Sequence, residues 1–141
     1  MNRIRIIATT LTVLLFFTGC DKYHRNKYTG DWDFVTEIVQ CQYLDGWKEI
    51  ERETVYYAGK ISSGTYENEL IIQYTENDIE RVSIPDTKST GIYSKNGLGN
   101  SKGATSGSFE GENRMYLHLC WNDNFPNGKI HYISGFKKSK K

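Results

Sequence analysis

Apolar and polar residues alternate along most of the chain after residue 30, with a period of two residues. In 31–40, for example, Trp32, Phe34, Thr36 and Ile38 fall on one side of an extended chain. A period of two is typical of a β-strand that buries one face. After residue 20, no stretch sustains an apolar repeat at helical spacing. The pattern therefore predicts an all-β domain.

We expect eight strands, separated by short polar or glycine-containing turns. Their expected ranges are 31–40, 47–60, 67–75, 79–84, a short strand centred on Ile92 and Tyr93, 104–111, 114–121 and 129–137. The second strand is long and rich in charge, which indicates that much of it is exposed to solvent.

The alternation also predicts which side chains point inward. In the third and fourth strands these are Leu70, Ile72, Tyr74, Val82 and Ile84, with Glu69 pointing outward. In the seventh they are Met115, Leu117, Leu119 and Trp121. In the last strand they are Ile130, Tyr132, Ser134 and Phe136.

Eight successive strands leave two open sheet edges unless the sheet closes on itself. Closure into an eight-stranded antiparallel up-and-down barrel is the simplest solution, and it is the fold we predict. A small β-sandwich satisfies the same alternation and is the alternative.

The first 20 residues follow another pattern. Arg3 and Arg5 precede an uncharged apolar stretch, 6–17. At about a dozen residues it suits the hydrophobic part of a signal peptide and is too short to span a bilayer alone. It ends in Phe17-Thr18-Gly19-Cys20. Small residues directly before a cysteine resemble the lipobox of bacterial lipoproteins, with Phe17 where leucine is usual.

The lipobox resemblance implies that 1–19 is removed and that Cys20 carries fatty acyl chains. Such an anchor holds the protein on a membrane of the bacterial envelope, facing the periplasm or the cell surface. A plain signal peptide, or an apolar segment that is retained, is the alternative. The chain then divides into a signal peptide (1–19), a polar lipidated tether (20–27) and a single β domain (28–141).

The charge of the chain is nearly balanced, with 18 basic and 17 acidic residues. Removal of Arg3 and Arg5 with the signal peptide changes the net charge from +1 to −1. Such a balance gives no basic surface for nucleic acid. We therefore expect no nucleic-acid partner, whereas the lipobox resemblance implies a membrane.

A second resemblance lies at the start of the first expected strand, Tyr28-Thr29-Gly30-Asp31-Trp32. Gly30 and Trp32 match the Gly-x-Trp motif of the lipocalin family, so the chain resembles a small lipocalin-like protein. The resemblance implies that Trp32 plugs the closed end of a barrel. It also implies that a basic residue of the last strand, Lys137 or Lys138, packs across the tryptophan ring. The long helix that lipocalins carry before their last strand has no counterpart in this sequence.

The lipocalin resemblance implies a small hydrophobic or amphipathic ligand inside the barrel. Aromatic side chains with polar ends suit such a ligand, and Trp47, Tyr74 and Tyr132 are our candidate ligand-binding residues. The same aromatic residues can equally fill a core. A filled core would favour the alternative, a structural or protein-interaction lipoprotein without a small ligand.

Enzymatic activity is not expected. The chain has no Gly-x-Ser-x-Gly motif, and its glycine-rich stretch 97–103 lacks the spacing of a phosphate-binding loop, so we expect neither catalysis nor a cofactor. His118 and His131 fall opposite each other if the last hairpin is centred near Asn124 and Phe125. Both alternate with expected core positions, which predicts a solvated outward pair rather than a metal site.

Two cysteines remain beside Cys20. Cys41 and Cys120 are expected to face outward at the same end of the barrel, on the strands that flank the last one. A disulfide needs Cα atoms within about 7 Å of each other, so a bridge across one strand would require a local bend. The sequence leaves open a disulfide or two free thiols.

Overall fold

A computed structural model of the protein describes residues 25–84, 91–94, 106–124 and 126–139, without the side chains of 93–94 and 122–124. The expected signal peptide, Cys20, the first part of the tether and the glycine-rich stretch 97–103 lie outside the described residues.

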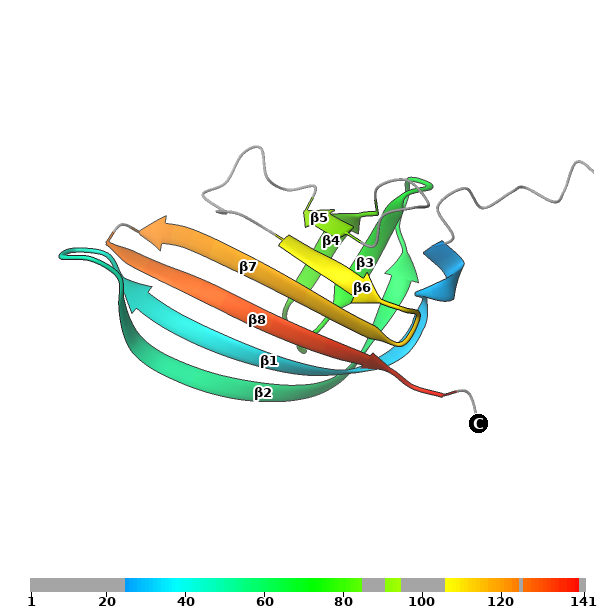
Figure 1. Cartoon of the computed structure of the whole chain (residues 1–141), viewed down its shortest axis with the longest axis horizontal. Coiled ribbons are helices and arrows are strands. Elements are labelled where there is room, and N and C mark those ends of the chain that lie inside the picture. The colour runs from blue at the N-terminus through cyan, green and yellow to red at the C-terminus, as the bar shows by residue number, and fades with distance from the viewer. Residues whose placement is uncertain (1–24, 85–90, 95–105, 125, 140–141) are drawn as a thin grey trace, which may run out of the picture.

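Eight antiparallel strands form a closed barrel in which each strand pairs with its neighbours in sequence (Figure 1). The strands are β1 Gly30–Gln42, β2 Lys48–Ser63, β3 Glu69–Gln73, β4 Ile79–Ser83, β5 Gly91–Ser94, β6 Ser106–Glu110, β7 Arg114–Asn124 and β8 Asn127–Lys137. One turn of 3-10 helix, η1 (Arg25–Lys27), precedes β1. The described residues contain no helix with the length and apolarity to cross a bilayer. The predicted all-β class and the eight-stranded barrel are confirmed.

The barrel closes over only part of its length. β2 pairs with β1 from Lys48 to Ile61, but with β3 only from Lys60 to Ser63. On the other side, β7 pairs with β6 no further than His118. The strands β2, β1, β8 and β7 therefore project beyond the short strands as a curved sheet (Figure 1). The exposure expected for the charged part of β2 is confirmed.

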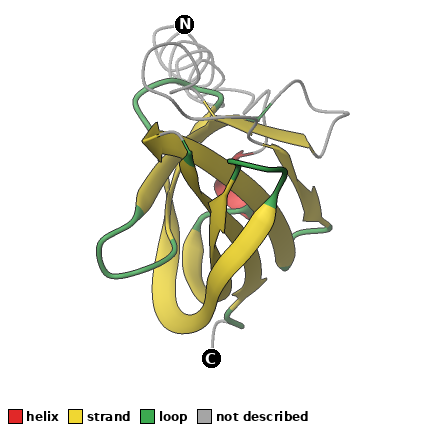
Figure 2. Cartoon of the chain, turned by 90° about the vertical axis from the view of Figure 1, so that its left-hand side faces the viewer, coloured by secondary structure: helices red, strands yellow, loops and turns green. Residues whose placement is uncertain are grey.

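The closed section is filled by its own side chains. Its buried cluster includes Trp32, Phe34, Leu70, Ile72, Ile92, Phe109, Met115, Leu117 and Ile133. One end of the barrel is covered by η1 and the residue after it, Tyr28, whose ring stacks on Phe109 with 3.8 Å between the ring centroids. Figure 2 looks from the opposite end and shows η1 framed by the strands. We call the η1 end the closed end and the opposite one the open end.

The backbones of β2 and β3 approach closely where the barrel closes. A β-carbon on Gly59 would lie 2.0 Å from the carbonyl oxygen of Gln73. No side chain fits into that space, so the turn of the sheet from the projecting part into the barrel requires glycine at this position.

The orientation expected for the last strand is wrong. His131 and Ile133 are buried, whereas Tyr132 and Phe136 are exposed. The β7–β8 register is irregular between Trp121 and Asn124. It places His118 opposite Tyr132 and Leu119 opposite His131. Opposed residues of an antiparallel pair share a face, so the two histidines lie on different faces and the expected outward pair does not form.

Glu69 alternates with the buried Leu70 and Ile72, as expected for an outward residue, but it is not exposed to solvent. Its side chain is buried, and its carboxylate accepts a hydrogen bond from the backbone N–H of Thr65 at 2.7 Å. Arg81 lies 3.7 Å from the same carboxylate oxygen. The carboxylate thus closes the β2–β3 turn by accepting a backbone donor that the short turn leaves without a ladder partner.

Candidate ligand site at the open end of the barrel

A cavity of about 220 Å³ lies at the open end. One wall comes from the β3–β4 hairpin and the other from the facing parts of β7 and β8. Its lining residues are Tyr74, Asp78, Ile79, Glu80, Trp121, Lys129 and His131. We call this space the mouth cavity.

The β3–β4 turn holds Asp78 at the rim of the mouth cavity. The hydroxyl of Thr75 donates a hydrogen bond to the Asp78 carboxylate at 2.7 Å and accepts one from the Asp78 backbone N–H at 2.9 Å. The backbone N–H of Tyr74 donates to the Asp78 carbonyl at 3.2 Å. Local side-chain bonds of this kind are how threonine and aspartate stabilise tight turns.

Tyr74 and His131 form the floor of the mouth cavity. The Tyr74 hydroxyl and Nδ1 of His131 share a hydrogen bond of 3.1 Å, and both side chains are almost completely buried. Trp121 meets the His131 ring edge-on, with the centroids 4.4 Å apart. Packing on both sides gives the floor a defined shape before any ligand arrives.

The mouth cavity is acidic. Burial raises the pKa of Tyr74 well above its ordinary value, and the negative charges of Asp78 and Glu80 raise it further. Glu80 is only 1% exposed, so its carboxylate acts on the cavity with little screening by water. Lys129 supplies the ammonium group of the lining.

Only one of the three candidate ligand-binding residues faces the mouth cavity. Tyr74 lines it, whereas Trp47 is 54% exposed in the loop before β2. Tyr132 lies on the outer face and stacks on His118, with 4.8 Å between the ring centroids. Glu80 was missed, although it shares the alternation of Val82 and Ile84 and could have been placed inward on that ground.

Gly30, Trp32 and Lys137 lie together at the closed end. Trp32 is opposite Lys137 in the β1–β8 register, and its indole N–H donates to the Tyr28 carbonyl at 2.9 Å. The Lys137 ammonium donates to the carbonyl of Lys27, and its Cε lies 3.5 Å from where a β-carbon on Gly30 would be. These contacts fasten η1 onto the barrel, away from the mouth cavity.

Lys138 has a different role from its neighbour. Its ammonium pairs with the Asp33 carboxylate at 3.0 Å on the outer face. The lipocalin resemblance implies that either Lys137 or Lys138 lies next to Trp32. In the structure it is Lys137.

Cys41 and Cys120 are free thiols. They belong to a small apolar cluster with Val39, Ile130 and Tyr43. The Cys41 thiol donates to the Tyr43 hydroxyl at 3.4 Å, and this contact, burial and the nearby Cys120 raise the Tyr43 pKa above its ordinary value. The two cysteines share one end as expected, but Cys41 is completely buried instead of facing solvent, and Tyr43 contacts both thiols in place of a bridge.

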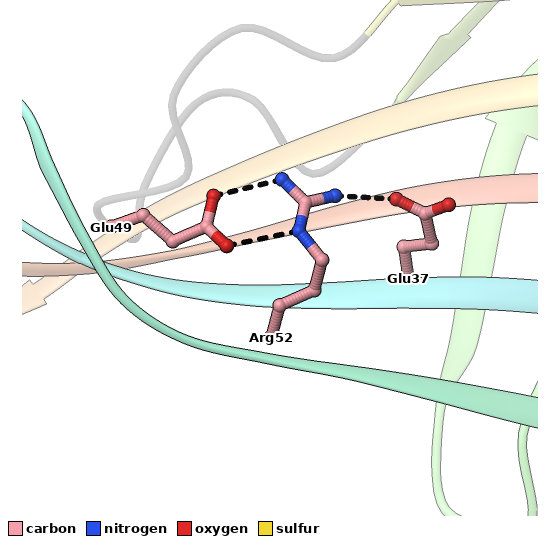
Figure 3. A network of polar contacts seen from close by, with 3 residues as sticks. All are labelled: Glu37, Glu49 and Arg52. Carbon is pink, nitrogen blue, oxygen red and sulfur yellow. Dashed lines mark hydrogen bonds and ion pairs between the residues drawn. The ribbon is translucent and has the colours of Figure 1, made fainter.

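An ion-pair network fastens β2 to β1 on the outer face. Arg52 donates two hydrogen bonds to Glu49, at 2.9 and 2.8 Å, and one to Glu37 at 2.5 Å (Figure 3). The hydrogen bonds from Arg52 lower the Glu49 pKa below its ordinary value. Exposed pairs contribute little stability, and these three residues take no part in the lining of the mouth cavity.

Comparisons with known proteins add little. No protein-family model matches the chain, and no curated protein matches it. Among solved structures, the ywiB protein from Bacillus subtilis is similar over 82% of this chain and 99% of that chain, with 11% identity and a TM-score of 0.35. So weak a likeness leaves the function to be argued from the site.

Proposed function

We propose that the protein is a lipid-anchored envelope protein that holds a small amphipathic ligand at the open end of its barrel. The observation that supports this proposal is the mouth cavity itself, where the buried Tyr74–His131 pair lies beside an aromatic wall and several charged groups. Binding sites commonly combine an apolar wall with a few convergent polar groups.

The ligand position differs from the one that the lipocalin resemblance implied. The closed section is occupied by Trp32, Phe34, Phe109 and their neighbours. Packed side chains leave no room for a ligand of ordinary size. We therefore place the ligand in the mouth cavity, between the β3–β4 hairpin and the β7–β8 pair.

The proposed anchor puts this cavity on the side away from the membrane. The described chain begins at Arg25, next to the closed end (Figure 1). Five residues of extended chain span at most about 18 Å, so an acylated Cys20 would hold the closed end near the bilayer. The open end would then face the surrounding compartment.

Native mass spectrometry of the protein as its cells produce it tests the ligand proposal. We expect a discrete added mass that is lost on denaturation and in Trp121→Ala, but retained in Tyr132→Ala, whose side chain lies on the outer face. A mass without any addition, unchanged after incubation with envelope extracts, would contradict the proposal.

Metabolic labelling with an alkyne analogue of palmitate tests the anchor. We expect label on the wild-type protein and none on Cys20→Ala, which should also leave the membrane fraction. Cys41→Ala is the matched control and should remain labelled. Equal labelling of the Cys20→Ala protein would exclude lipidation at this cysteine.

A second candidate function, protein binding, is favoured by the outer face of β7 and β8. Tyr116 and Tyr132 are exposed there and line a groove of about 250 Å³ together with His118, and Phe136 is exposed on the same face. Exposed aromatic residues grouped on one face are typical of interfaces. A photo-crosslinking residue at position 116 should then give a discrete adduct in cells, whereas one at exposed Glu112 should not.

A further inference from the structure

The charges around the mouth cavity favour one class of ligand. Its lining contains two carboxylates, Asp78 and Glu80, and one ammonium group, Lys129. The buried carboxylate of Glu80 is fixed on the inner face of β4, whereas Lys129 is only partly buried. A long lysine side chain can turn its charge toward solvent, but a buried glutamate cannot.

The acidic character continues along the projecting sheet. Glu53 is opposite Ile38 and Glu51 is opposite Gln40, in the same cross-strand rows as His131 and Lys129 of β8. Both glutamates are exposed. The inner face that leads to the mouth cavity therefore carries negative charge beyond the lining itself, which attracts cations and repels anions.

The remaining walls suit the body of such a ligand. Trp121 is partly buried at the edge of the core, and Ile79 is 58% exposed at the rim. A tryptophan ring is the side chain most favourable to a cation, and it also contacts apolar carbon. A space of about 220 Å³ suits a small molecule.

We propose that the ligand of the mouth cavity is a small organic cation, with its ammonium or guanidinium group against Asp78 and Glu80 and its apolar body against Trp121 and Ile79. This inference rests on the proposed ligand-binding function. Partial removal from water strengthens the attraction between a carboxylate and a cation. The same carboxylates exclude an anion of equal size.

Three probes of similar shape but different charge test whether the ligand is a cation: hexylamine, 1-hexanol and hexanoate. They are titrated calorimetrically at neutral pH into the full-length protein in nanodiscs, with empty nanodiscs as the reference for partition into lipid. We expect hexylamine to bind at least tenfold more tightly than hexanol, and hexanoate to bind least. Raising the salt concentration should weaken the binding of hexylamine alone.

Charge-removing variants identify the groups responsible. Asp78→Asn and Glu80→Gln should each weaken hexylamine about tenfold and leave hexanol unchanged, since each keeps a hydrogen-bond acceptor. Lys129→Met should strengthen hexylamine, because it removes a like charge. Thermal unfolding of each variant shows whether its fold is retained.

The outcomes separate this inference from the proposal beneath it. Suppose that hexanol or hexanoate binds as tightly as hexylamine, and that this binding is lost in Trp121→Ala. The preference for a cation would then be wrong, but the mouth cavity would still be the ligand site. Weaker hexylamine binding in Lys129→Met would also overturn the preference for a cation, in favour of a ligand that carries a negative group. If none of the three probes binds and the native mass shows no added ligand, the proposal of ligand binding itself would be wrong.

Discussion

The Tyr74 hydroxyl lies 3.1 Å from Nδ1 of His131, and this hydrogen bond joins residues 57 positions apart in the sequence. It connects the end of β3 to the middle of β8 across the open end. Because both side chains are buried, the bond fixes how far the β3–β4 hairpin stands from β8. That separation is the width of the mouth cavity.

Tyr74→Phe removes this bond and keeps the ring. We expect the free energy of unfolding to fall by about 1–3 kcal/mol, since the variant takes away the hydroxyl that a buried nitrogen shares. Urea denaturation followed by circular dichroism measures the change. Tyr56→Phe, at a residue that is 76% exposed, should change it by less than about 0.5 kcal/mol. Equal effects of the two substitutions would show that the bond contributes nothing.

The raised pKa of Tyr74 predicts a loss of stability at high pH. The folded protein keeps the phenol protonated above pH 10.0, the ordinary pKa, whereas the unfolded chain releases the proton there. Stability is then unaffected by this group below pH 10 and falls above it, by at most about 1.4 kcal/mol per pH unit.

Comparing the wild-type protein with Tyr74→Phe isolates this contribution, because Tyr43 also has a raised pKa and remains in both. Denaturation midpoints measured from pH 8 to 11 should fall less steeply in the variant. Parallel pH profiles would mean that Tyr74 ionises as readily in the folded state as in the unfolded chain.

Gly59→Ala should disturb the junction between the projecting sheet and the closed barrel. The added methyl group would meet the Gln73 carbonyl oxygen, and a backbone atom cannot move aside as a flexible side chain can. We expect a loss of about 1–3 kcal/mol in the free energy of unfolding, the usual cost of overpacking. The neighbouring Ala58→Ser, on the exposed face, should leave the thermal midpoint nearly unchanged. A stable Gly59→Ala protein would contradict the close approach of β2 and β3.

The thiols of Cys41 and Cys120 should be reduced in the purified protein. Alkylation in denaturant without a reducing agent should modify both, as read from the masses of their peptides. In the folded protein, Cys120 should react before Cys41, because Cys41 is completely buried. Recovery of a peptide pair joined through sulfur would contradict the contact of both thiols with Tyr43.

The fold was accessible from the sequence because alternation determines both strand and face. The alternation puts Trp32, Phe34, Thr36 and Ile38 on one face of the first strand, and all four are buried. The error in β8 has a physical source. Both faces of that strand carry apolar residues, such as Ile133 inside and Phe136 outside. Only the irregular register near Trp121 determines which of these two faces points into the barrel.

The site was harder to predict than the fold. The alternation predicts an inward Tyr74, but it also predicts an outward orientation for its partner His131, as for His118, because of the same error in β8. The partial closure of the barrel was also not foreseen, since it depends on how few residues of β2 pair with β3. Long-range register of this kind has no local signature in the sequence.

The central claim is that the ligand lies in the mouth cavity. The three tryptophans report on it separately: Trp121 lines the cavity, Trp32 lies at the closed end, and Trp47 is exposed before β2. Nuclear magnetic resonance of the three indole N–H groups, recorded while the hexyl probes are added, compares these places in one experiment. Our account predicts that the Trp121 signal shifts and saturates while the other two stay in place. A saturating shift of Trp32 or Trp47, with Trp121 unmoved, would contradict it.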